Sequence, residues 1–281
     1  MRKALCCLTL VVLMVGAASA VVAQAVPTSQ PKYVSILREQ VKIGRGADHA
    51  KWEAGWPAAY EKAKATQPYL ALVSETGSRE TWYVTPYDSH AALEAASKRE
   101  EADPVLSAEL ERLNKGDAEF LSELRSLQAA ARPDLSHGQF PDLAKVRYYE
   151  ITIFRVKPGY ESGFAAVAKA YAGAADRSAP KASWRTYEVM AGAPSGTFLV
   201  FSSLESYAAF DQAMEDGMNM SKSFSGEELV SMQKFMSEGL ISAETNRFRL
   251  DPQQSYVGKE TREKDPAFWM PKPPAKKAAQ P

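Results

Sequence analysis

"YYEITIFRVKPG", residues 148 to 159, decides the fold, because the chain carries a close relative of this stretch earlier. Aromatic and β-branched residues dominate its first nine positions, and a turn signal with glycine follows, so the stretch predicts a β-strand. The earlier relative is "YVSILREQVKIGRG", residues 33 to 46. Val41 and Val156 are each followed by lysine and then by glycine two residues later, at a separation of 115 residues. The match predicts two halves that begin alike.

A second internal similarity links "DSHAALE", residues 88 to 94, to "ESYAAFD", residues 205 to 211. Each follows two strand-like runs and predicts the start of a helix. A third links "EFLSE" (119 to 123) to "KFMSE" (234 to 238) and predicts a later helix in both halves. The order of each half is then strand, helix, two strands, helices and strand, which is the ferredoxin-like βαββαβ plan.

The predicted fold class is therefore α+β, with tandem ferredoxin-like repeats at residues 33–136 and 145–257. A ferredoxin-like sheet carries its helices on one face and leaves the other face to be covered. Two copies in one chain can press these open faces together. We expect an intramolecular, pseudo-dimeric α/β barrel with helices outside, for which a monomer or a weak homodimer would suffice.

The first 25 residues have the layout of a secretory signal peptide. Arg2 and Lys3 precede an apolar run and then small residues, with cleavage expected after Ala25 or, alternatively, after Ala20. The apolar run is too short for a membrane span. Both cysteines of the chain lie inside this segment, so thiolate catalysis and cysteine metal sites are excluded for the mature protein. We expect a secreted or periplasmic protein.

Charge and composition limit the classes of binding partner that we expect. The 34 basic and 34 acidic residues balance, and no basic stripe indicates nucleic-acid binding. Residues 258–281 are rich in Pro, Ala and Lys towards their end and predict a disordered tail. The remaining expectation is a small-molecule ligand.

Three stretches resemble the dimeric α/β barrel superfamily, in particular its NIPSNAP-like and antibiotic-biosynthesis-monooxygenase-like members. They are "RVKPGY..GF" (155 to 164), "SLESYAAF" (203 to 210) and "ARPDLS" (131 to 136). The resemblance spans roughly residues 33 to 256. It implies a fold more than an activity, because such families include cofactor-free oxygenases, haem enzymes and proteins without known activity. Most relatives build the barrel from two chains.

The period-two pattern of the first strands suggests ligand-binding candidates. Apolar residues such as Tyr149 and Ile151 are expected to meet the helices, and their neighbours are expected to point into the barrel. This reasoning gives five candidates for the barrel lining: Glu39, Tyr148, Glu150, Thr152 and Phe154. Enclosed carboxylates can act as acid or base. The alternative is that they form salt bridges with Arg38 or Arg155.

None of the three histidines has a metal-binding spacing such as HxxxH. No metal site and no cofactor are expected from this pattern. Haem-binding relatives need a proximal histidine, and His90 and His49 are the candidates that the resemblance leaves. His137 lies between the predicted halves. Three functions stay open: an exported protein that binds a small, partly apolar molecule between two sheets, a cofactor-independent monooxygenase-like enzyme, and a haem-binding protein. Whether the chain is an enzyme is left open.

Overall fold

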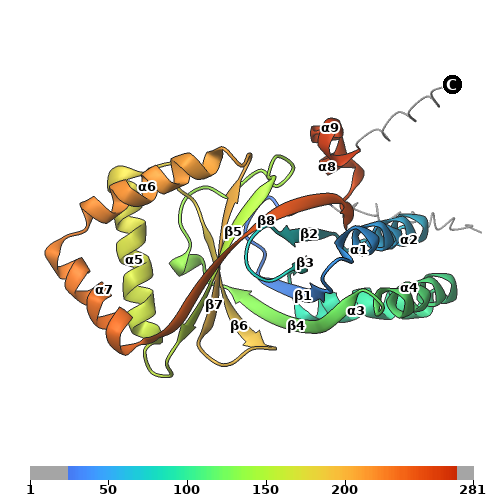
Figure 1. Cartoon of the computed structure of the whole chain (residues 1–281), viewed down its shortest axis with the longest axis horizontal. Helices are drawn as coiled ribbons and strands as arrows, with labels where there is room; N and C mark the ends of the chain where they lie inside the picture. The colour runs from blue at the N-terminus through green and yellow to red at the C-terminus, as the bar shows by residue number, and fades with distance from the viewer. Residues whose placement is uncertain (1–24, 271–281) are drawn as a thin grey trace, which may run out of the picture.

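The two stretches that begin the predicted halves form the strands β1 (Tyr33–Val41) and β5 (Tyr148–Val156), with the predicted bounds. They belong to a computed structural model that describes residues 25–270. Residues 1–24 of the predicted signal peptide lie outside this range. Figure 1 shows a central barrel between two groups of helices, α1–α4 on one side and α5–α7 on the other.

Between these two strands lie α1 (Gly46–Glu53), α2 (Gly55–Ala63), β2 (Tyr69–Ser74), β3 (Glu80–Tyr87), α3 (His90–Ala102), α4 (Pro104–Asp117), β4 (Leu121–Ala131) and the 3-10 helix η1 (Pro133–Leu135). After β5 follow α5 (Glu161–Ser178), β6 (Arg185–Ala191), β7 (Thr197–Leu204), α6 (Ala209–Ser223), α7 (Gly226–Glu238), β8 (Leu240–Tyr256), α8 (Lys259–Lys264) and α9 (Pro266–Trp269).

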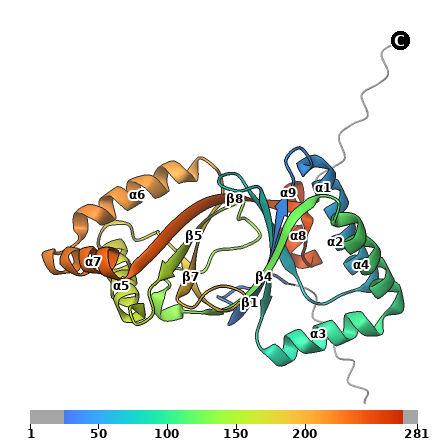
Figure 2. The ribbon, with the colours of Figure 1, turned by 60° about the horizontal axis from the view of Figure 1, so that its bottom comes forward.

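The strands form one closed barrel in the order β1-β3-β2-β8-β5-β7-β6-β4. All of the described strand pairs are antiparallel. Two strands join the halves. β8 pairs with β5 through residues 240–249 and with β2 through residues 248–256, while β4 pairs with both β1 and β6. Figure 2 shows both strands crossing between the two helical groups.

The facing predicted for the first strands is wrong. Val34 and Ile36 of β1 pack with Tyr149 and Ile151 of β5 in the barrel interior. On β1 the alternate residues Ser35, Leu37 and Glu39 face the helices instead. The physical reason is that a closed barrel excludes water from its whole interior, so the more apolar face turns inward. The helices cover only part of the outer surface of the barrel. The strand face that carries both polar and apolar residues therefore lies on this outer surface.

Local signals account for the helix boundaries. Asp103 caps α4 by accepting hydrogen bonds from Val105 and Leu106, and Pro104 occupies its first turn. Ser225 and Glu228 form a capping box at the start of α7. Pro57 lies in the first turn of α2, where its missing N–H costs no intrahelical bond.

Two predictions need correction, one near the end of the first half and one after the end of the second half. Residues 121–123 belong to β4 rather than to a helix, because the barrel closes only if this segment pairs with β1. The tail predicted from residue 258 is wrong for residues 259–269, which form α8 and α9 and bury Trp269. Residues 271–281 lie outside the described range. No helix within residues 25–270 has the length and apolar character needed to cross a membrane.

Candidate functional site

A cavity of about 450 Å³ lies between the helix-facing side of the first strands and the helices α1, α2 and α4. We call it the N-terminal cavity. Its lining combines rings, hydroxyls, an amide and acids, among them Trp56, Tyr60, Tyr69, Tyr83, Ser35, Thr85, Asn114, Glu39, Glu53 and Asp117. A volume of this size is in the range of pockets that bind small organic molecules.

Strand alternation brings the first part of this lining together. Ser35, Leu37 and Glu39 alternate along β1 and share its helix-facing side. Ser35 lies opposite Thr85 of β3, and Leu37 lies opposite Tyr83. Cross-strand neighbours point to the same face of a sheet, so the hydroxyl of Thr85 and the ring of Tyr83 continue the wall that β1 begins.

Two helices close the cavity with further acids. His49 and Glu53 are four residues apart on α1 and therefore share one helix face. Asp117 is the last residue of α4. Close helix packing holds these ends in place, because a Cβ atom at Gly116 would lie 2.0 Å from Trp52 Cζ2. Only glycine lets Trp52 pack across the end of α4.

Glu39, His49, Glu53 and Asp117 form a buried group that we call the acidic cluster. Each is at most 4% exposed, and their ligand-type atoms all lie within 4.8 Å of one another. His49 Nε2 lies 2.9 Å from Glu39 Oε2 and 3.6 Å from Asp117 Oδ1. Asp117 Oδ1 is itself buried and has no hydrogen-bond partner among the described residues.

Burial sets the protonation of the cluster. It raises the pKa of Glu39 to about 8, with the charge of Asp117 adding to the rise. It raises the pKa of Glu53 to about 8 as well, helped by the charges of Glu39 and Asp117. The pKa of Asp117 rises for the same reason, and burial lowers the pKa of His49 despite the neighbouring carboxylates. The metal-free cluster at neutral pH therefore holds protons rather than three full negative charges.

Outer contacts orient the cluster. Trp56 Nε1 donates to Glu53 Oε1 at 3.0 Å. The Tyr83 hydroxyl interacts with both glutamates and lies 3.1 Å from Gln254 Oε1. Carboxylates and imidazole are also the groups with which proteins bind divalent cations. The arrangement can thus transfer protons at the end of the cavity or hold a cation there.

The five ligand-binding candidates do not come together. Glu39 alone belongs to the N-terminal cavity. The other four lie on the second half and face its helices: Tyr148 beside Tyr207, Glu150 paired with Arg247, Thr152 hydrogen-bonded to Thr245, and Phe154 against Phe164. For Glu150 the salt-bridge alternative is right in kind, although Arg247 is the partner rather than Arg155.

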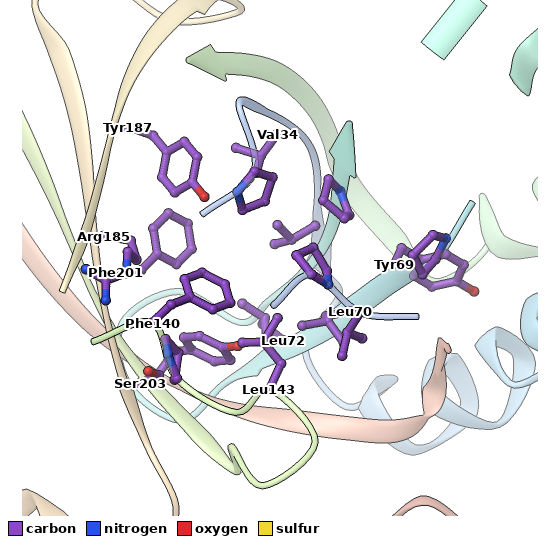
Figure 3. A pocket seen from close by; sticks show the side chains of 18 residues that line it. Val34, Tyr69, Leu70, Leu72, Phe140, Leu143, Arg185, Tyr187, Phe201 and Ser203 are labelled. Atoms are coloured by element: carbon purple, nitrogen blue, oxygen red, sulfur yellow. The ribbon is translucent and has the colours of Figure 1, made fainter. Parts of the chain in front are cut away.

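The barrel interior, where a ligand was expected, is a packed apolar core. Its cavity measures about 80 Å³ and is lined by Leu72, Phe140, Tyr187 and other apolar side chains (Figure 3). This cavity is much smaller than the N-terminal cavity, and most of its lining is apolar. Figure 3 also shows Tyr69 turned away from this interior, with its hydroxyl towards the helices.

Glu53 and Asp117 are the cluster residues that the sequence reasoning missed. His49 was considered only as a haem ligand, and its Nε2 atom faces Glu39 and Asp117. The usable signal was the His-x-x-x-Glu spacing at positions 49 and 53, because residues four apart on a helix lie on one face. His90 is exposed on α3, and its ring lies tilted against that of Tyr33. His137 packs on Trp184 beside η1.

In the comparisons with known proteins, similarity to this chain was found at the level of the fold and not of the sequence. No family model matches the sequence, and no curated protein is similar to it at a significant level. Two similar solved structures are described as "putative monooxygenase". The one from Lactobacillus acidophilus has a TM-score of 0.50 at 7% identity, over 81% of this chain and 97% of that one. The one from Fusobacterium nucleatum has a TM-score of 0.51 at 9% identity, over 78% and 91%.

A chlorite dismutase from Candidatus Nitrospira defluvii follows, with a TM-score of 0.47 at 10% identity over 84% of this chain and 96% of that one. At identities this low, the likeness to the two structures described as putative monooxygenases shows the fold and nothing finer. The α/β barrel expected from the sequence is the fold that the two monooxygenase-described structures share with this chain.

Proposed function

We propose that this chain is an exported protein that binds a small, partly apolar molecule in the N-terminal cavity. One observation carries the proposal: a space of about 450 Å³ has rings on its walls and polar groups at its end. That combination is typical of small-molecule sites. The proposal keeps the ligand class expected from the sequence and moves its site from the barrel interior to the space under the helices.

Aromatic side chains supply the apolar part of the site. The rings of Tyr60 and Tyr69 lie 6.0 Å apart, and those of Tyr69 and Tyr83 lie 5.9 Å apart, both edge to face. With Trp56 they offer flat apolar surfaces to a ligand. The Tyr69 hydroxyl is buried and has no hydrogen-bond partner within residues 25–270. A ligand acceptor group would satisfy it, which favours a molecule with at least one oxygen or nitrogen atom.

The test uses N-phenyl-1-naphthylamine, a neutral aromatic probe whose fluorescence rises in apolar pockets. The wild-type protein should bind it saturably with one probe per chain. Ser35→Phe places a ring in the cavity and should weaken binding at least about tenfold. Ser242→Phe is the matched control on the exposed part of β8 and should bind like wild type. Equal binding by Ser35→Phe and wild type would overturn the proposed site.

A monooxygenase-like enzyme is a second candidate, favoured by the two structures that share the fold and by the acids beside the cavity. Its substrate, an activated aromatic compound, would occupy the N-terminal cavity, which Glu39 lines. Tyr148, Glu150 and Thr152 line no part of that cavity and would not contact the substrate. Oxygen uptake with 1,5-dihydroxynaphthalene tests it. One oxygen atom of O2 would enter the ring to give juglone, and the other would leave as water with two hydrogens from the substrate. Uptake at the rate of the protein-free solution would remove this candidate.

Haem does not fit the two histidines that the sequence offered. His49 is 2% exposed, and its Nε2 atom lies 2.9 Å from Glu39 Oε2. This nitrogen therefore faces a carboxylate rather than a space that could hold haem. His90 lies at the surface of α3 against Tyr33 and borders neither the N-terminal cavity nor the barrel cavity. No step is therefore assigned to haem.

Export and internal repetition complete the proposal. The order of helices and strands from β1 to β4 resembles the order from β5 to β8, which supports two tandem ferredoxin-like repeats. A chain that supplies both halves closes its own barrel, so we expect a monomer in light scattering. Recovery of a chain beginning at residue 26 or 21 from the exported fraction would support the signal peptide. An uncleaved chain confined to the cell interior would refute it.

A further inference from the structure

The acidic cluster has the composition of a cation site. Glu39 from β1, His49 and Glu53 from α1, and Asp117 from α4 converge from three elements. We propose that these four residues bind one divalent first-row transition metal ion, of the class of Zn²⁺ or Mn²⁺. The proposal does not depend on a ligand in the N-terminal cavity, because it concerns side chains that already meet.

Geometry is the first support. One ligand atom from each residue lies within 4.8 Å of all the others, so an ion placed among them has four potential ligands around it. Metal–ligand bonds to His and carboxylate groups are about 2.0–2.2 Å long, and two ligands on one ion are therefore separated by at most about twice that length. Small side-chain adjustments bring the four atoms into that range.

The unpartnered oxygen of Asp117 is an independent support. Asp117 is 4% exposed, and its Oδ1 atom is buried without a hydrogen-bond partner among the described residues. His49 Nε2 lies 3.6 Å from this oxygen and is already 2.9 Å from Glu39. In the metal-free cluster the other available donor to the Asp117 carboxyl is the proton held by Glu53. A buried acceptor outside hydrogen-bond distance of His49 is costly unless a proton or an ion satisfies it, and an ion at the centre of the cluster would do so.

Charge balance is the third support. Within residues 25–270 the ion-pair contacts of the three cluster carboxylates involve only His49, with no lysine or arginine among them. Buried charges need a partner of opposite sign. A divalent cation provides it. The competing arrangement keeps protons on the carboxyl groups and binds no ion, and it is an outcome of the test below.

The ligand types select the ion. One imidazole nitrogen disfavours Mg²⁺ and Ca²⁺, which prefer oxygen ligands alone, and the mature chain has no cysteine to select soft ions. Trp56, which donates to Glu53, is an outer-shell group of the kind that orients metal ligands. Three of the ligands border the N-terminal cavity, and His49 borders a second cavity of about 500 Å³ on its other side. An ion can enter from either one.

The experiment titrates the full exported chain, stripped with EDTA and dialysed, with ZnCl2 and separately with MnCl2 in a calorimeter. Wild type should bind one ion per chain. His49→Gln, Glu53→Gln and Asp117→Asn should each weaken binding about 100-fold or more, since even loss of an outer-shell partner costs about 10- to 100-fold. His90→Gln and Glu94→Gln, both exposed on α3, should bind like wild type.

Several outcomes would overturn the inference. Wild type that binds neither ion would show that protons alone occupy the cluster. Unchanged affinity in Glu53→Gln or Asp117→Asn would place the ion elsewhere, and these near-isosteric variants remain decisive if His49→Gln does not fold. Ser35→Phe separates the two proposals, because it should lose the naphthylamine probe and keep the metal. Metal binding without probe binding would refute only the proposed function, and the reverse would refute only this inference.

Discussion

His49 Nε2 lies 2.9 Å from Glu39 Oε2. Helix α1 is thus in contact with strand β1, from which only a short turn separates it in the chain. Residues 42–45 make this turn, and Gly44 takes a φ of +84° within it. The contact couples β1 to α1 through two buried ionisable groups. The protonation of the cluster should therefore affect the stability of the fold as well as its ligands.

Glu53→Gln should gain stability relative to wild type as the pH rises in metal-free buffer. The pKa of Glu53 is 4.5 in an unfolded chain and about 8 in the folded one. Between these values the unfolded state loses its proton and the folded state keeps it, so unfolding releases protons and wild-type stability falls with rising pH. Glutamine cannot ionise and does not lose this stability. Urea unfolding in EDTA at pH 5, 6.5 and 8 measures the difference.

The control for this experiment is Glu94→Gln, whose carboxyl is exposed on α3. Its stability difference from wild type should be the same at all three pH values. A Glu53→Gln difference that stays constant from pH 5 to 8 would contradict the raised pKa. Zinc added to wild type at pH 8 should restore stability, since an ion bound only by the folded state shifts the equilibrium towards it.

Gly116→Ala should destabilise the protein by about 1–3 kcal/mol, as overpacked cores do. The new Cβ would meet the ring of Trp52, which packs across the end of α4. Displacing that ring also shifts Asp117, so zinc affinity should fall. Gly217→Ala is the matched control, because nothing lies within 4 Å of a Cβ atom there. In the middle of α6 it should stabilise by about 0.5–1 kcal/mol. Urea unfolding compares the two, and equal effects would refute the packing argument.

The sequence predicts the strands well because their signals are local. The nine-residue strands at 33–41 and 148–156 combine β-branched and aromatic residues with a turn at their ends. The plan predicts a last strand in the first half, but its position was not found. The sequence of β4, with several alanines, has little strand propensity, and only pairing with β1 and β6 makes it a strand. Such tertiary pairing cannot be read from a local pattern.

The site was harder to predict than the fold. Period-two alternation separates the two faces of β1 but does not say which face is inside, so Glu39 was identified and placed on the wrong side. The cluster depends on three elements meeting, and its members His49 and Asp117 are separated by 68 positions in the chain (117 minus 49). The expectation of no metal considered histidine pairs and overlooked a histidine four residues before a glutamate.

Glu150→Gln should change little. Glu150 accepts a hydrogen bond from Arg247 Nε at 3.1 Å, and the two side chains are about one third exposed. Exposed pairs of this kind contribute about 0–1 kcal/mol to stability. Urea unfolding should show a loss within that range, while naphthylamine and zinc binding stay at wild-type values. Loss of either activity in Glu150→Gln would move the functional site to the second half of the chain.

Trp269→Ala should destabilise the protein by about 3–5 kcal/mol, the usual cost of removing a buried aromatic side chain. Trp269 is 5% exposed, packs in the main core and donates from Nε1 to the Ala144 carbonyl at 2.9 Å. The neighbouring Met270 is 49% exposed, and Met270→Ala should change stability by less than about 0.5 kcal/mol. Urea unfolding separates the two cases: equal, small effects would restore the disordered tail predicted from residue 258, whereas a large loss confined to Trp269→Ala would make α9 part of the domain.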